Sequence, residues 1–240
     1  MVAGSSLSAQ QDTARALPPV SITASRGGLP VIVAPLSITQ VTRSAWAGLP
    51  GYALSDALGL VPGVLAQSRY GNGDIRLTIR GFGSRGAGDR SNSGTSRGVR
   101  VLVNGVPETE PDGRTAFDNV DLAAAQSIDV VRSNASAQWG NAAGGVVNVS
   151  TIPVFSAPFL AEDNTIGGFG LKRISLSAGT PAGDGRLFGT IVTSSFDGYR
   201  KNSMSSRTVL DGGIVAPLGT RTLLRTLLTS ATYRQSSRVT

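Results

Sequence analysis

The chain has 240 residues, with 22 basic and 15 acidic side chains, a net charge of +7, and neither cysteine nor histidine. These absences exclude disulfides, thiolate nucleophiles, a Ser-His-Asp triad and histidine-based metal sites, so we expect no cofactor, no metal site and no enzymatic activity. The arginines are scattered and only two lysines occur, which indicates ordinary surface charge and no nucleic-acid partner. A content of 31 glycines favours turns and strands over long helices.

The N-terminal region is polar and extended in character. Residues 1–16 are predicted to be disordered, and Leu7–Ala9 is typical of the small-residue end of a secretory signal whose charged and apolar regions are missing. We interpret this as a start site assigned too late, with an ordinary disordered N-terminus as the alternative. The next segment, "LPPVSITASR" (17–26), predicts an isolated strand, which can pair with another protein by strand addition or simply be the first strand of the domain.

Residues 31–153 alternate short strands and short helices, which predicts a compact α+β domain. A strand is expected over 31–42 with a break at Pro35, and a helix over 54–61, where apolar residues recur at helical spacing before Pro62-Gly63. Further strands are expected at 75–81, 99–106, 127–133 and 146–151. A polar loop is expected at 107–114, a short helix at 117–126 with Asp118 or Asp121 at its start, and a helical turn within 134–145.

The segment Gly81–Gly86 matches the G-x-G-x-x-G pattern of dinucleotide-binding proteins. That pattern requires a helix after the glycines, whereas residues 87–98 are Gly, Ser, Asn and Arg without an apolar period and are predicted to form a loop. We therefore reject a dinucleotide site. The glycines instead allow the chain to leave the strand sharply, with little side-chain bulk against a neighbouring backbone.

Helical signals end after Pro153. Residues 168–180 and 185–200 predict one hairpin, and residues 206–234 predict a second that turns near Pro217–Gly219. Apolar and polar positions mix along strands of about 10 to 14 residues, which is typical of outer-membrane barrel strands. Antiparallel strands of a soluble β-sandwich would have a similar pattern, so both interpretations stay open at this point.

Five motifs between residues 17 and 152 resemble, in order, those of the plug domain of TonB-dependent outer-membrane receptors. They are "LPPVSITASR", "LSDALGLVPGV", "LTIRGFGSRG", "VRVLVNGVPETEPDG" and "IDVVRSNASAQWGNAAGGVVNVST". The sequence departs from the family at Ser133-Asn134, where Gly-Pro is usual, and at Trp139, where Tyr is usual. The resemblance implies an α+β plug domain followed by antiparallel β-strands of an incomplete transmembrane β-barrel, in the outer membrane of a Gram-negative bacterium.

The resemblance also implies a division of the chain and a set of site residues. Residues 1–16 would precede a TonB-box-like segment at 17–26, a plug at 27–153 and the first four or so barrel strands at 160–240. Arg80 and Arg132 would contact the barrel, with single surface arginines as the alternative. TonB would bind Leu17, Pro18, Pro19, Val20, Ser21, Ile22, Thr23 and Ala24. Apical loops would bind the ligand through Glu110, Asp112, Arg114, Gln138, Trp139 and Asn141, unless these are ordinary solvated turns.

An importer with these parts would have TonB, outer-membrane lipid and a small-molecule chelate as partners, an iron–siderophore complex being the commonest ligand of the family. About four strands are too few to close a barrel, since bacterial barrels have at least eight. We therefore expect an N-terminal piece of a receptor, whether a truncated gene or a fragment. The rival hypotheses are a non-functional truncated receptor and a soluble secreted binding module in which residues 160–240 complete a β-sandwich.

Overall fold

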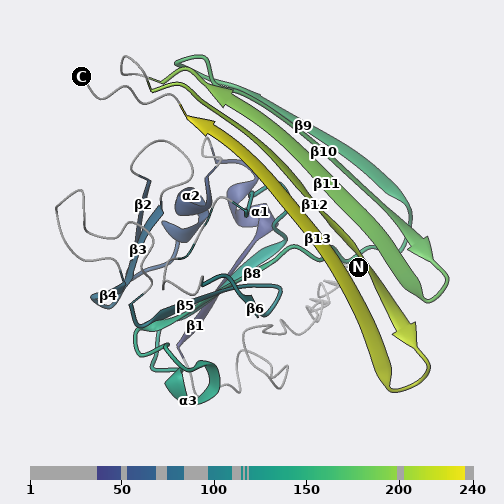
Figure 1. Cartoon of the computed structure of the whole chain (residues 1–240), viewed down its shortest axis with the longest axis horizontal. Helices are drawn as coiled ribbons and strands as arrows, with labels where there is room; N and C mark the ends of the chain where they lie inside the picture. The colour runs from purple at the N-terminus through teal and green to yellow at the C-terminus, as the bar shows by residue number, and fades with distance from the viewer. Residues whose placement is uncertain are drawn as a thin grey trace, which may run out of the picture.

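The structure, a computed structural model, describes residues 37–49, 53–68, 75–83, 97–109, 115, 117, 119–198 and 203–235. It has two parts (Figure 1): a mixed N-terminal unit, and a long antiparallel sheet that curves over one side of this unit. The concave face of the long sheet is turned toward the unit. No helix in the described part of the chain is long and apolar enough to cross a membrane.

The N-terminal unit is built on a five-stranded sheet whose strand order is β1-β7-β8-β5-β6. These strands are β1 (Ile38–Thr42), β7 (Ser127–Val131), β8 (Gly145–Ser150), β5 (Val99–Val103) and β6 (Val106–Pro107). The β5–β8 pair is parallel and the other pairs are antiparallel. A second sheet contains β2 (Val64–Ser68), β3 (Ile75–Ile79) and β4 (Phe82–Gly83). Three short helices complete the unit: α1 (Arg43–Trp46), α2 (Leu54–Leu58) and α3 (Ser136–Trp139).

Apolar side chains cover both faces of the five-stranded sheet. On one face, valines of β7, β8 and β5 pack with α2 and β3 in a cluster that includes Leu58, Ile75 and Ile79. On the other face a smaller cluster joins Val131 and Val146 to the segment around α3. Five of the six residues of β8 are buried, as expected for a strand covered on both sides.

Two tight hairpin turns define how the strands of the unit connect. Arg80 and Gly81, between β3 and β4, have φ of 52° and 81°, and Asn104 and Gly105, between β5 and β6, have φ of 52° and 84°. Two consecutive residues with positive φ are the signature of a type I′ turn, for which Asn-Gly is the preferred sequence. The predicted strand over 99–106 is therefore a strand, a turn and a second short strand. The strands at 75–79 and 99–103 belong to different sheets.

The sharp exit that the glycine motif predicts is confirmed. Gly83 has φ of 111°, and a Cβ at this position would overlap the carbonyl oxygen of Leu77. The Phe82 side chain packs so closely on Gly98 and Gly144 that neither has room for a Cβ without a shift of the ring. The glycines thus serve close backbone and ring packing.

The predicted helix over 117–126 is wrong. Residues 122–124 form a turn, in which the backbone carbonyl of Asp121 accepts bonds from the N–H groups of Ala124 and Ala125. The Asp121 carboxylate accepts a bond from the N–H of Ala123 at 2.8 Å, as a helix cap would, but the segment makes only one turn before β7 begins at Ser127. The helix predicted over 54–61 does form, although it ends at Leu58.

The long sheet is a meander of five strands in sequence order. They are β9 (Phe159–Ile166), β10 (Lys172–Ala182), β11 (Gly185–Phe196), β12 (Ser205–Leu218) and β13 (Thr222–Gln235). The sequence predicted about four strands, and β9 is the additional one. A β-sandwich would need a second sheet packed on the first, whereas these strands form one sheet. The fold class predicted from the sequence, an α+β plug followed by antiparallel strands, is confirmed.

Candidate functional site

Asp121 makes a buried charged contact between the N-terminal unit and the long sheet. Its Oδ1 accepts a hydrogen bond from Nη2 of Arg173 at 2.5 Å, and its Oδ2 lies 3.5 Å from Nη1 of Arg207. All three side chains are at least nine-tenths buried. Arg207 also donates through Nη2 to the carbonyl of Val120 at 2.8 Å. One carboxylate of the unit therefore neutralises two arginines of the sheet.

The strand pattern explains why both arginines point at the unit. On β10, buried and exposed residues alternate strictly from Lys172 to Ala178, so that Arg173, Ser175 and Ser177 all face inward. On β12, Arg207 is inward for the same reason. In an extended strand, successive side chains point to opposite faces. Neither arginine is among the site residues predicted from the sequence, although the period-2 pattern of "KRISLSA" indicates that Arg173 faces inward with Ser175 and Ser177.

A second ion pair joins the same two parts of the molecule. Arg43, at the start of α1, donates through Nη1 to the carbonyl of Ala123 at 2.6 Å, and its Nη2 lies 3.2 Å from Oδ2 of Asp163 on β9. Both side chains of this pair are partly exposed, at 33% and 59%. A cavity of about 260 Å³ lies beside the pair, and its lining includes Trp46 and Arg173.

The hydrogen bonds of Arg80 and Arg132 stay within the N-terminal unit. Arg80 Nη1 donates to the carbonyl of Arg132 at 3.1 Å. Arg132 donates to the carbonyl of Pro62 at 3.0 Å and to Oγ1 of Thr39 at 3.1 Å. In the described part of the chain, the arginines that meet charged groups across the two parts are Arg43, Arg173 and Arg207. A role of Arg80 and Arg132 in binding further barrel residues stays a prediction.

Three of the predicted ligand-binding residues lie in or just after α3. Gln138 is exposed, whereas Trp139 is half-buried against the smaller apolar cluster. Asn141 accepts a bond from the backbone N–H of Gly98 at 3.1 Å, which ties the α3 segment to the start of β5. Trp139 and Asn141 thus also have a packing role. The other predicted ligand residues, Glu110, Asp112 and Arg114, and the TonB-box-like residues 17–24 lie outside the described residues.

Asn134 accounts for one departure from the family motif. Its Oδ1 accepts a bond from the N–H of Ser136 at 3.0 Å, so that its side chain holds the entry to α3. Asparagine is a favoured residue for such local bonds to the backbone.

Among the described residues of the unit, Glu108 is the titratable group whose pKa is shifted. Burial raises the pKa of its carboxyl above the ordinary value of 4.5, and a hydrogen bond from Asn119 partly opposes this rise. Glu108 is half-buried and lies at the start of the predicted apical loop, two residues before Glu110. Among the described residues, no group of three or more acidic side chains is placed to hold a metal ion.

Comparisons with known proteins agree with this architecture. Residues 30–146 match the family model of the TonB-dependent Receptor Plug Domain. The ferric-catecholate import receptor Fiu from E. coli superposes with a TM-score of 0.65 at 17% identity, over 85% of this chain and 28% of that chain. The ferric citrate transporter FecA in its unliganded form gives 0.70 at 18% identity, over 92% and 35% of the two chains.

A third solved structure is the ferripyoverdine receptor of the outer membrane of Pseudomonas aeruginosa bound to ferripyoverdine, with a TM-score of 0.69 at 18% identity. It is matched over 90% of this chain and 27% of its own length, so this chain spans about a third or less of each of the three receptors. Identities this low establish the fold alone. The match assigns residues 30–146 to the TonB-dependent receptor plug-domain family, and five consecutive antiparallel strands follow this plug domain in the chain.

Proposed function

We propose that the chain is the plug and the first strands of an outer-membrane receptor that imports an iron–siderophore complex with energy delivered through TonB. The observation that carries this proposal is the plug held on the concave face of the sheet by the buried contact of Asp121 with Arg173 and Arg207. Outer-membrane transporters with about 22 strands have a lumen that is closed by a plug, whereas narrower porins leave an open channel. The names of the structural relatives, which are receptors for ferric catecholate, ferric citrate and ferripyoverdine, support iron chelates as the class of ligand.

In this proposal the plug closes the barrel lumen and is displaced during transport. Ligand would bind the apical loops, and residues 17–24 would pair with TonB in the periplasm by strand addition. Force on that segment would then reach the plug. Because both apolar clusters lie within the plug, and its ion pairs with the sheet are few, the plug can shift without exposing the larger part of its core.

The TonB step is tested by pull-down of the receptor with the periplasmic domain of TonB. Deletion of residues 19–23 should abolish capture, because a strand that adds to a partner supplies its backbone hydrogen bonds. A deletion of equal length at residues 5–9, which precedes the segment, is the matched control and should leave capture unchanged. Equal capture of both deletion variants would show that residues 17–24 are not the TonB-binding segment.

The ligand step is tested by growth under iron limitation on different ferric chelates with the intact gene deleted. The chelate that fails to support growth of the deletion strain is taken as the ligand. Trp139→Ala and Arg114→Ala should each weaken binding of this chelate to the receptor by about 1–3 kcal/mol, as for residues in a desolvated contact. Ser91→Ala, in the polar loop that we do not assign to the site, is the control. Wild-type affinity in both alanine variants would leave ligand recognition to the barrel.

A further inference from the structure

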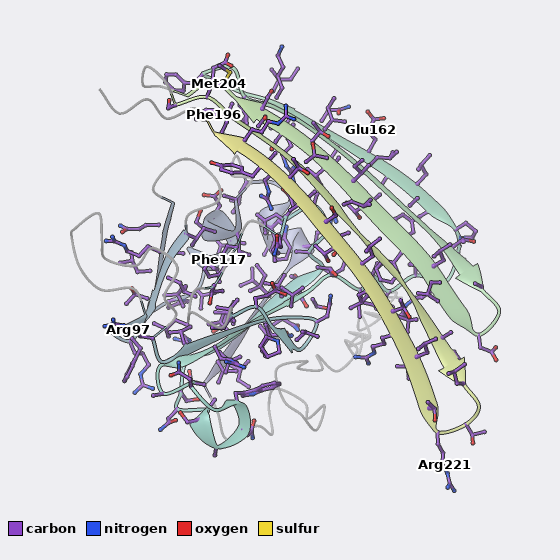
Figure 2. The ribbon with its side chains drawn as sticks, viewed as in Figure 1. Arg97, Phe117, Glu162, Phe196, Met204 and Arg221 are labelled. Carbon is purple, nitrogen blue, oxygen red and sulfur yellow. The ribbon has the colours of Figure 1, made fainter. Side chains whose placement is uncertain are left out.

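The convex side of the long sheet carries a wide apolar band and few charges. The side chains on this side alternate with those that face the plug, and leucines and isoleucines predominate among them in the middle of the strands. Only three charged residues of the described strands point this way: Glu162, Lys172 and Arg234. Figure 2 shows Glu162 projecting from the convex side. Under the proposed function, on which this inference rests, the convex side faces lipid.

The two cations lie on a single row that crosses the sheet. Lys172 pairs with Ser195, Ser195 with Ser206, and Ser206 with Arg234. Residues paired across antiparallel strands project from the same face, so the row presents two cations with two hydroxyl groups between them. Three strand spacings separate the cations, or about 14 Å between backbones. The fifth member of the row is Ile166, so no acidic side chain lies on it.

The row lies at the end of the sheet that has the longer connections. At this end residues 167–171 and 197–204 join the strands, whereas residues 183–184 and 219–221 join them at the other end. Figure 2 places Phe196 and Met204 at the first end and Arg221 at the second. Outer-membrane barrels have short periplasmic turns and longer extracellular loops. The cationic row is therefore at the extracellular interface of the membrane.

A shallow apolar notch lies three rows below the cations, on the same convex side. The row that contains it runs through Ala178, Gly189, Gly212 and Leu228. Because the two glycines have no side chains, a cavity of about 340 Å³ remains between the flanking residues, which include Leu210, Ile214, Thr226 and Leu228. The notch and the cationic row share strands β11, β12 and β13.

The separation of the two features fits one lipid molecule. Six residues along a strand span about 20 Å, which becomes about 15 Å of depth when strands tilt by about 40°. This depth is half of the roughly 30 Å hydrocarbon core of a bilayer. A phosphate at the cationic row would therefore place its acyl chain alongside the notch.

We infer that this surface binds a phosphate-bearing, anionic lipid of the outer leaflet. The phosphate lies among Arg234, Ser206, Ser195 and Lys172, where charge-assisted bonds to arginine and lysine are strong. An acyl chain fills the notch at Gly189 and Gly212. Glu162, which accepts a bond from Asn164 at 2.7 Å, lies on β9 two rows below Lys172. Its carboxylate repels phosphate and so confines the headgroup to the side of the sheet near Arg234.

The test uses the complete receptor in a neutral detergent, with bound lipid counted by native mass spectrometry. Phosphatidylglycerol should be retained in preference to phosphatidylcholine. Arg234→Gln should lower phosphatidylglycerol affinity about fivefold, and the addition of Lys172→Gln should lower it about fivefold again. Arg225→Gln is the matched control, because Arg225 is on the same strand but shares a row with plug-facing Val215. It should leave lipid affinity unchanged.

Two further variants separate charge and shape from folding. Arg234→Lys keeps the cation and should keep binding. Gly189→Val should weaken binding by filling the notch, because a Cβ at Gly189 meets only the Asp211 carbonyl oxygen, at 3.7 Å, and fits the sheet. Equal lipid affinity of Arg234→Gln and Arg225→Gln would overturn the inference, as would equal retention of the two lipids or displacement of lipid by millimolar inorganic phosphate. Fractionation of the wild type into the outer membrane separately tests the proposed function.

Discussion

Loss of the Asp121 carboxylate should loosen the plug more than loss of any other single charge in the described contact. Its side chain is 4% exposed and lies between the guanidinium groups of Arg173 and Arg207. Asp121→Ala would remove the carboxylate that Arg173 and Arg207 share. The two arginine positions are two strand spacings apart, or about 10 Å, so their repulsion is about 2 kcal/mol at an effective dielectric of 20. With the lost pairing included, we expect destabilisation by about 3–5 kcal/mol.

The assay is urea unfolding of the chain in detergent, followed by tryptophan fluorescence. Both tryptophans, Trp46 and Trp139, lie in the plug, so the signal reports the plug alone. Asp163→Ala is the control. Its carboxylate is 59% exposed and pairs with Arg43, and such pairs contribute at most about 1 kcal/mol. If Asp121→Ala costs no more than Asp163→Ala, the plug is not held by this buried contact.

Two further predictions concern the interior of the plug. Gly83→Ala should lower the free energy of unfolding by more than about 2 kcal/mol, because Gly83 has a positive φ and a Cβ there would overlap the backbone. Gly48 has open space around it, so Gly48→Ala should be nearly neutral. Equal urea midpoints of the two variants would contradict this prediction. Burial raises the pKa of Glu108, so the folded plug binds its proton more tightly than the unfolded chain and loses stability as pH rises from 4.5 through the raised pKa. Glu108→Gln should therefore stabilise the plug at pH 7 and have less effect below pH 4.5, and a gain that is independent of pH would refute the assignment.

The sequence predicts those elements of the plug whose structure is decided by neighbouring residues, such as helices and tight turns. The apolar spacing of Leu54, Ala57 and Leu58 places α2, and its predicted extension to Val61 is replaced by a turn beyond Gly59. The Asn104-Gly105 pair marks a type I′ hairpin, although the apolar residues on both sides made the segment resemble one continuous strand. Short apolar stretches do not reveal where one strand ends and another begins when the turn between them is two residues long.

The site was harder to predict because its members are far apart in the chain. Asp121 has the character of a helix-start residue, and its carboxylate does hold a local turn. Its pairing with Arg173 and Arg207, 52 and 86 positions later, depends on how the long sheet wraps the plug. Strand alternation fixes which face each arginine occupies, but the partner on the other side of the interface comes from tertiary structure alone. Arg80, the arginine of a family motif, was predicted to contact the barrel, and its described hydrogen bond is to the carbonyl of Arg132 within the plug.

The division between apolar and charged contacts bears on how such a plug can move. Every member of the two apolar clusters lies between Ile38 and Val149, so both clusters lie within the plug. The described ion pairs and hydrogen bonds with the sheet are those of Asp121 with two arginines, Arg43 with Asp163, and Asp211 with Thr151. The apolar side chains of Val192 and Val209, on the same face of the sheet as the two arginines, are also buried. Buried ion pairs add little net stability over apolar packing, yet a buried charge that has lost its partner is strongly unfavourable. These charged contacts therefore favour one position of the plug against the sheet while contributing little to the free energy that holds the two together. A force applied at the N-terminal end would then have to break these charged contacts, which water can solvate once they separate, and would expose the inward-facing Val192 and Val209 while both apolar clusters of the plug stay intact.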